Sequence, residues 1–153
     1  MPKKKDSRNA LYKKSWNSLL TSISQEKKNE KVNKVTVLES YLIDSEFSDE
    51  NIQKCAKALT NETIEKYSIN KIFSSVEKFD YVLEIGFLPG VTDNVATTAK
   101  EMLTDLLSLP NNTNLKIYTS KIFAISGKLT KRDTDKIANS LHNPLIESAL
   151  IVN

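Results

Sequence analysis

Residues 59–69 read LTNETIEKYSI, and residues 141–151 read LHNPLIESALI. In both stretches Asn comes two residues after Leu, and an Ile-Glu pair follows three and four residues after that Asn. A shift of 82 positions lays residues 43–69 over residues 125–151 without a gap. Eight of these 27 positions are identical, where composition alone gives about two: Ile43/Ile125, Lys54/Lys136, Ala56/Ala138, Leu59/Leu141, Asn61/Asn143, Ile64/Ile146, Glu65/Glu147 and Ile69/Ile151. The chain therefore contains an internal duplication.

Hydrophobic periodicity places similar elements around both copies. Strands are expected at residues 35–43, 63–69, 79–88, 115–126 and 144–152, and the fourth is long enough for one strand or for two joined by a bend. Helices are expected after Ser48, after Thr92 or Asp93, and after Thr130, because these residues cap helices well. A further helix is expected over residues 9–23, from the three- and four-residue spacing of Tyr12, Trp16, Leu19, Leu20 and Ile23.

The repeating unit of strand, helix, strand, helix and strand predicts the α+β class and a tandem of ferredoxin-like repeats that forms a pseudo-dimer. Residues 1–8 are too short and too charged for a strand and are expected to be a basic disordered lead-in. Residues 9–78 would be a first repeat that lacks its opening strand, and residues 79–153 a complete second repeat. Two such units would share one core, since a unit of that size is marginally stable alone.

The composition argues against several functions. The 153 residues include three Gly, one Cys and one His, too few for a Gly-rich phosphate cradle, a zinc site or an internal disulfide. There is no long apolar run and no signal peptide, so a cytoplasmic protein without a membrane partner is expected. The net charge of +3 divides into +7 over residues 1–34 and −4 over the rest, and the only Arg residues are Arg8 and Arg132. Arg supplies most base and phosphate recognition, so no nucleic-acid partner is expected.

Neither reactive side chain has a catalytic setting. Cys55 lies between Lys54 and Ala56 on the apolar side of an expected helix, which favours a core residue. His142 follows the end of another helix, where an interaction with the helix dipole or a carbonyl is expected. We therefore expect no catalytic, cofactor-binding or metal-binding residue in this chain.

Three segments carry a family resemblance: FLPGVTDN at residues 87–94, SGKLT at residues 126–130, and LHNPLIE at residues 141–147, which is echoed by LTNETIE at residues 59–65. Together they resemble the PurS family and the PurS-like N-terminal domain of the large phosphoribosylformylglycinamidine synthases of purine biosynthesis. In that family a turn with Val and Asp leads the first helix, and a Leu-x-Asn-x-x-Ile-Glu segment ends the second. The Pro that often follows the turn Asp in the family is Asn94 here.

The resemblance implies a non-catalytic domain or subunit that bridges a synthetase part and a glutaminase part and aids ammonia transfer between them. ATP and magnesium would belong to the catalytic part of such a ligase. Because single-copy PurS subunits dimerise, two copies in one chain resemble the fused-domain version of the family; a homo-oligomer of this chain is a further expected partner. The resemblance marks ten residues as the family motif and the expected partner interface: Leu88, Pro89, Gly90, Val91, Thr92, Asp93, Asn61, Glu65, Asn143 and Glu147. Pro89-Gly90 is also compatible with a plain turn into the next helix.

Two other functions are compatible with the same fold class. Residues 85–91 also resemble the ligand loop of ACT domains, in which a Pro-Gly turn lets backbone amides approach an amino acid, so the alternative function is a small-molecule-sensing regulatory domain. RNA binding through the sheet would need aromatic stacking positions beside basic residues, and Lys121-Ile122-Phe123 offers too little.

Overall fold

The computed structural model describes residues 8–15, 31–71 and 79–152. Over these residues it has six strands: β1 (Arg8–Ser15), β2 (Val32–Asp44), β3 (Glu65–Ile69), β4 (Tyr81–Phe87), β5 (Lys116–Gly127) and β6 (Glu147–Val152). The same residues form three helices: α1 (Asp49–Ala58), α2 (Asn94–Leu106) and α3 (Lys131–Leu141). The predicted α+β class is confirmed. Within the described residues, no helix is both long enough and apolar enough to cross a membrane.

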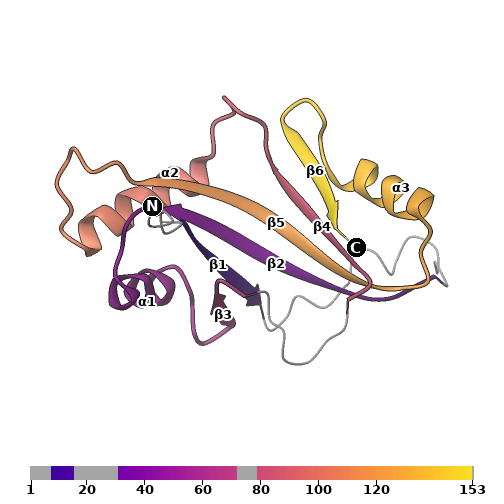
Figure 1. Cartoon of the computed structure of the whole chain (residues 1–153), viewed down its shortest axis with the longest axis horizontal. Helices are drawn as coiled ribbons and strands as arrows, with labels where there is room; N and C mark the ends of the chain where they lie inside the picture. The colour runs from indigo at the N-terminus through magenta and orange to yellow at the C-terminus, as the bar shows by residue number, and fades with distance from the viewer. Residues whose placement is uncertain (1–7, 16–30, 72–78, 153) are drawn as a thin grey trace, which may run out of the picture.

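The six strands form one antiparallel sheet in the order β3-β1-β2-β5-β4-β6. Its centre is made by the two longest strands, β2 with 13 residues and β5 with 12, which lie side by side (Figure 1). Their pairing runs from Lys34 opposite Ser126 to Asp44 opposite Lys116 without a shift of register. The segment expected to be one strand or two is therefore one continuous strand.

The two halves of the sheet have the same strand arrangement. β1 lies between β2 and β3, and β4 lies between β5 and β6. The β2–β5 ladder joins the halves, and within it Glu39 faces Lys121, the residue 82 positions later in the chain. Each half is compatible with a ferredoxin-like arrangement.

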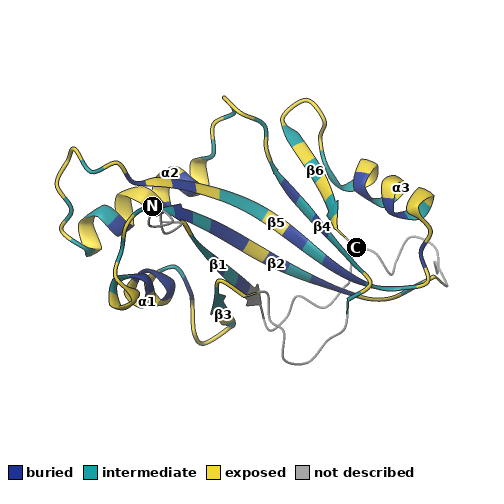
Figure 2. Ribbon diagram, in the orientation of Figure 1, coloured by how far each residue is buried: buried dark blue, intermediate teal, exposed yellow. Residues whose placement is uncertain are grey.

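All three helices pack on the same face of the sheet. At one end α1 and α2 close a core over β1, β2 and β5 that contains Leu11, Tyr41, Ile43, Cys55, Leu103 and Ile117 (Figure 2). At the other end α3 places Ala138 on Leu83 and Ile85 of β4. The first of these cores combines α1 with α2, so it draws on residues from both halves of the chain.

Each helix begins at a capping side chain that the sequence predicts. Ser48 caps α1, Asp93 caps α2 and Thr130 caps α3, and each side-chain oxygen accepts a backbone N–H from the first turn. Of the two predicted caps for α2, Asp93 and not Thr92 fills the role. In α3 the Asp133 side chain also accepts the N–H of Thr130, which completes a capping box.

The N-terminal segment differs from the sequence-based expectation. A helix was expected over residues 9–23, but Arg8–Ser15 form strand β1, which pairs with β2 and β3. The first half therefore has an opening strand, and the expectation that it lacks one is wrong. The cause is Lys13, which is buried at 8% exposure although lysine side chains usually lie in solvent. The sequence therefore does not reveal that Leu11 and Lys13, two residues apart, both point into the core, as the period of a strand requires. Residues 16–23 of the expected helix and residues 1–7 of the expected lead-in lie outside the described residues.

Candidate functional site

The recurring Asn and Glu residues build two loops with matching hydrogen bonds. In the first Asn-Glu loop (residues 61–65), Glu65 Oε2 accepts the N–H of Asn61 at 2.8 Å, and Asn61 Oδ1 accepts the N–H of Thr63 at 3.2 Å. In the second Asn-Glu loop (residues 143–147), the same bonds join Asn143 to Glu147 at 2.8 Å and to Leu145 at 3.1 Å. The motif thus has an intramolecular role, which is to close the turn between a helix and the next strand.

The first Asn-Glu loop is also held by a buried lysine on β1. The Nζ of Lys13 donates to the carbonyl oxygen of Leu59 at 2.8 Å and lies 3.4 Å from Glu65 Oε2 and 3.6 Å from Glu39 Oε2. It also lies 5.4 Å from the centre of the Tyr41 ring, within reach of a cation–π interaction. The two carboxylates, the carbonyl and the ring together offset the cost of burying the charge.

Tyr41 lies where this lysine cluster meets the middle of the sheet. Burial raises the pKa of its phenol above the ordinary value, and the Lys13 ammonium opposes that rise in pKa in part. The phenol is therefore neutral at pH 7. It supplies a ring face to Lys13 and a wall to the space beside it.

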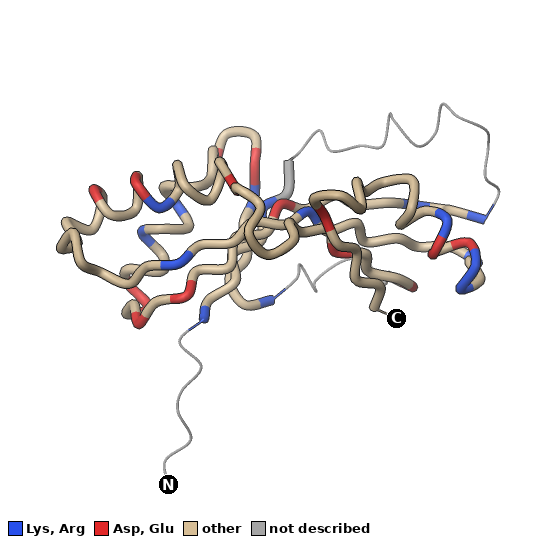
Figure 3. Tube along the Cα trace, turned by 90° about the horizontal axis from the view of Figure 1, so that it is seen from above, with Lys and Arg blue, Asp and Glu red and all other residues tan. Residues whose placement is uncertain are grey.

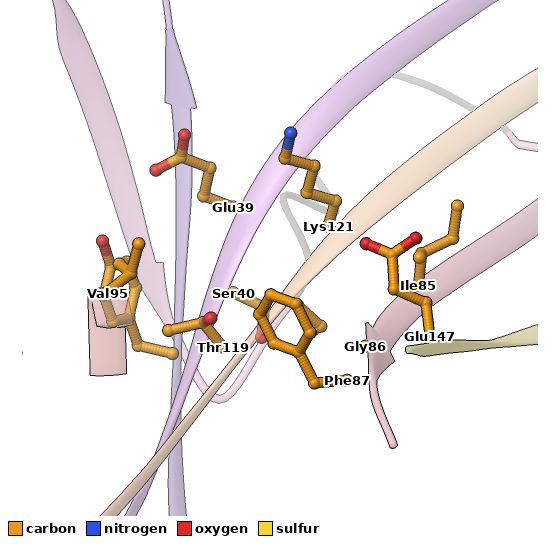
Figure 4. A pocket seen from close by; sticks show the side chains of 11 residues that line it. Glu39, Ser40, Ile85, Gly86, Phe87, Val95, Thr119, Lys121 and Glu147 are labelled. Atoms are coloured by element: carbon orange, nitrogen blue, oxygen red, sulfur yellow. The ribbon is translucent and has the colours of Figure 1, made fainter. Parts of the chain in front are cut away.

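A cavity of about 320 Å³ lies over the centre of the sheet, on the helix side. We call it the central cavity; it is lined by Glu39, Ser40, Tyr41, Ile85, Gly86, Phe87, Val95, Thr119, Ser120, Lys121 and Glu147. Figure 4 shows the side chains of Glu39, Lys121 and Glu147 around it, together with the Phe87 ring. The cavity thus combines two carboxylates, one ammonium group and apolar side chains, a mixture suited to a small charged ligand.

Asp93 fixes one wall of this cavity. Its Oδ1 caps α2 through the N–H of Ala96 at 2.9 Å, and its Oδ2 accepts the N–H and hydroxyl of Thr119 at 3.0 and 2.7 Å. Both carboxylate oxygens are therefore used inside the protein. Asp93 is therefore a positioning residue that ties the start of α2 to β5. Its predicted contact with a partner protein stays a prediction.

Pro89-Gly90 forms a turn that leads into α2, as one of its two sequence-based interpretations predicts. The N–H of Val91 donates to the Leu88 carbonyl at 3.1 Å, and Gly90 has φ +84°. Pro at the second position and a positive φ at the third are typical of a type II turn. Pro89, Gly90 and Thr92 are exposed and do not line the central cavity.

The structure brings part of the predicted set together. The N–H of Leu88 donates to the Ile146 carbonyl at 2.9 Å, and Phe87 lies opposite Glu147, so the Pro-Gly turn and the second Asn-Glu loop lie side by side. The first Asn-Glu loop precedes β3 at the opposite edge of the sheet (Figure 1). The ten predicted residues therefore form two separate groups.

Cys55 and His142 have the structural roles expected of them. Cys55 is fully buried in the core of α1 and α2, and burial raises the pKa of its thiol, which makes it less reactive. His142 lies at the end of α3, where its Nδ1 contacts the Ala138 carbonyl oxygen. The described residues contain no group of three or more His, Cys, Asp or Glu that could hold a metal ion.

Lys13, Glu39, Tyr41 and Lys121 belong to this site but stand in no motif that marks them as site residues in the sequence. One signal was present: the 82-residue shift superposes Glu39 on Lys121, a change of charge at the centre of the duplicated strand. Basic and acidic residues are mixed along the described part of the chain (Figure 3).

Comparison with known proteins returns no family: no family model matches the sequence, and no curated protein matches it.

Proposed function

We propose that the chain is a non-catalytic PurS-like domain or subunit of the ATP- and glutamine-dependent phosphoribosylformylglycinamidine synthase of de novo purine biosynthesis. It bridges the synthetase and glutaminase parts and aids ammonia transfer, while ATP and magnesium bind to the catalytic part. The observation that carries the proposal is the Leu-x-Asn-x-x-Ile-Glu segment, which occurs twice and forms the same loop each time. Residue identity and hydrogen bonding agree at both places.

The strand registers support a tandem of two ferredoxin-like units in this domain. In the β2–β5 ladder from Lys34 onward, moving the β2 residue of any pair forward by 82 positions and its β5 partner back by 82 gives another pair of the same ladder. For example, the pair Lys34–Ser126 becomes Lys116–Asp44. β3 and β6 are related by the same shift of 82, whereas β1 and β4 are related by a shift of 72, so that Leu11 of β1 corresponds to Leu83 of β4. A pseudo-twofold axis between Glu39 and Lys121 accounts for all of these pairings.

An exposed apolar surface supports the bridging role. Phe87 is 40% exposed, Leu145 83% and Ile146 40%, and they flank the Pro-Gly turn on the side where the two motif segments meet. Large apolar side chains grouped on a surface mark sites of protein–protein contact. We call Phe87, Pro89, Gly90, Leu145 and Ile146 the loop surface and assign the partner contact to it.

The test is reconstitution with the synthetase and glutaminase parts of phosphoribosylformylglycinamidine synthase. The chain should co-elute with them and raise glutamine-dependent turnover. Leu145→Asp should weaken the complex by about tenfold or more, because it places a charge in an apolar contact. Thr63→Asp is the matched control, since Thr63 holds the equivalent place in the first Asn-Glu loop, and it should leave the complex unchanged. Absence of both co-elution and any effect on turnover would refute the proposal.

The alternative is an ACT-like regulatory domain, favoured by the cavity beside the end of β4. In that case a ligand would approach the backbone at Pro89-Gly90, whereas the cavity is lined by Gly86 and Phe87. Ligand-induced protection of the Gly90 and Val91 amides from hydrogen exchange would favour the sensor over the bridging domain.

A further inference from the structure

The starting point is one carboxylate that occurs in two environments. Glu65 and Glu147 each accept the N–H of an Asn through Oε2, at 2.8 Å in both cases. This bond fixes each carboxylate at the start of an edge strand, β3 or β6. What differs is the residue of the neighbouring strand that lies beside it.

In the first half that neighbour is a lysine. Lys13 of β1 lies opposite Tyr67, two residues after Glu65, and its Nζ lies 3.5 and 3.4 Å from the two carboxylate oxygens. The carboxylate thus has a primary ammonium as its partner, and the four-carbon stem of Lys13 packs within the core.

In the second half the corresponding neighbour is Ile85. It lies on β4 opposite Ala149, two residues after Glu147, so it has the place that Lys13 has in the first half. Among the described residues, Glu147 has no cation within ion-pair distance, and its side chain lines the central cavity instead (Figure 4). The cavity therefore lies where a lysine side chain would extend if Ile85 were a lysine.

The residue opposite Ile85 also carries the opposite charge to the residue opposite Lys13. Lys13 lies opposite Glu39 on β2, whereas Ile85 lies opposite Lys121 on β5. Glu39 is already 3.6 Å from the Lys13 ammonium, so Glu147 and Lys121 are the charges that the cavity offers to a ligand. One carboxylate and one ammonium group complement a zwitterion.

We infer that the central cavity binds a small aliphatic amino acid, with its ammonium on Glu147, as the Lys13 ammonium lies on Glu65, and its carboxylate on Lys121. The apolar part of the ligand lies against Phe87 and Val95, which line the cavity and are 40% and 55% exposed. This inference goes beyond the bridging function and does not rest on it, since it follows from the correspondence of Ile85 with Lys13 and from the charged and apolar side chains that line the central cavity.

The experiment is isothermal titration calorimetry of the full chain, without partner proteins, against three probes. L-Leucine carries both charged groups, 3-methylbutylamine lacks the carboxylate, and 4-methylpentanoate lacks the ammonium. Leucine should bind, and each half-ligand should bind roughly 10–100-fold more weakly, because one charge-assisted contact is lost. No heat from leucine at about 10 mM would overturn the inference.

Two variants test the ammonium contact. Glu147→Gln keeps an oxygen for the Asn143 N–H and should weaken leucine by about tenfold or more. Ile85→Lys should abolish binding, because the new ammonium reaches Glu147 as Lys13 reaches Glu65. Ile85→Met, of similar volume and without charge, is the matched control and should still bind. Unchanged leucine affinity in both Glu147→Gln and Ile85→Lys would refute the site.

Lys121→Met tests the carboxylate contact. It should weaken leucine by about tenfold and leave 3-methylbutylamine unchanged. An equal effect on both probes would refute the assigned orientation. Because no synthetase or glutaminase part is present, failure of this experiment leaves the bridging proposal untouched, and failure of the reconstitution leaves this site untouched.

Discussion

At the scale of single residues, the three glycines differ in what they require. A Cβ on Gly127 would lie 2.1 Å from the carbonyl oxygen of Lys31 and 3.0 Å from the Cα of Val32. Gly90 has open space around it and a φ of +84°. A Cβ on Gly86 would meet the Ser120 Cβ at 3.7 Å and the Thr119 carbonyl oxygen at 3.9 Å, both of which are ordinary contact distances. Gly127 is thus required by a close approach of the backbone and Gly90 by its left-handed conformation, whereas neither reason applies to Gly86.

Alanine substitution should separate these cases. Gly127→Ala should cost about 2–3 kcal/mol of unfolding free energy, because backbone atoms must move. Gly90→Ala should cost about 1–2 kcal/mol through its backbone conformation alone, and Gly86→Ala should change stability by less than about 0.5 kcal/mol. Urea unfolding at pH 7 measures all three. Equal costs for Gly127→Ala and Gly86→Ala would contradict the close approach.

Asp133 should contribute stability that depends on pH. Hydrogen bonds from the backbone and then the side chain of Thr130, helped by Lys31, lower its pKa from 3.8 to about 2. The charged form is thus favoured by folding, and its contribution is present above pH 4 and is lost as pH falls toward 2. Asp133→Asn should lower Tm at pH 7 and have little effect at pH 2. Thermal melts followed by circular dichroism at both pH values test this dependence, with Asp135→Asn as the control. An equal loss of Tm at pH 7 and pH 2 would refute the pH-dependent contribution of Asp133.

At the scale of elements, α2 depends on packing against α1. Leu103 of α2 and Cys55 of α1 are both fully buried in one core. Leu103→Ala should cost about 2–5 kcal/mol and should speed alkylation of the Cys55 thiol, since the thiol is exposed only when the helices separate. Leu106→Ala, on the exposed side of α2, should change neither. Thiol labelling followed by mass spectrometry measures the rate, and fast labelling of the unaltered chain would contradict a closed core.

At the scale of the whole molecule, the shared core makes the second half dependent on the first. Residues 79–153 alone would lose Leu11, Tyr41 and Cys55, against which α2 packs. We expect this fragment to show no cooperative thermal unfolding as a monomer. Circular dichroism together with sedimentation tests the expectation, and a sharp transition at the monomer mass would show that the half folds by itself.

The sequence predicts the elements whose signals are local and does not predict the contacts that only folding creates. Strand periodicity and capping residues predict β2, β4 and all three helices, because their apolar positions and caps are local properties. β1 was mistaken for a helix because Lys13 is buried by partners on β2, β3 and the end of α1, which only the folded chain brings together. The central cavity was missed for the same reason. The Asn-Glu segments were found by their recurrence, but their bonds to their own loops could not be inferred from residue types.

The facing pair Glu39 and Lys121 has a consequence for how such a protein is encoded. In a dimer of identical subunits, the residue on the symmetry axis must face a copy of itself, so a charged residue there meets its own charge. Here the two positions lie in one chain and can be altered separately, and they carry opposite charges. In the proposed pseudo-dimer, the two units can therefore differ at the one point where the subunits of a homodimer cannot, and the cavity there can have unequal walls.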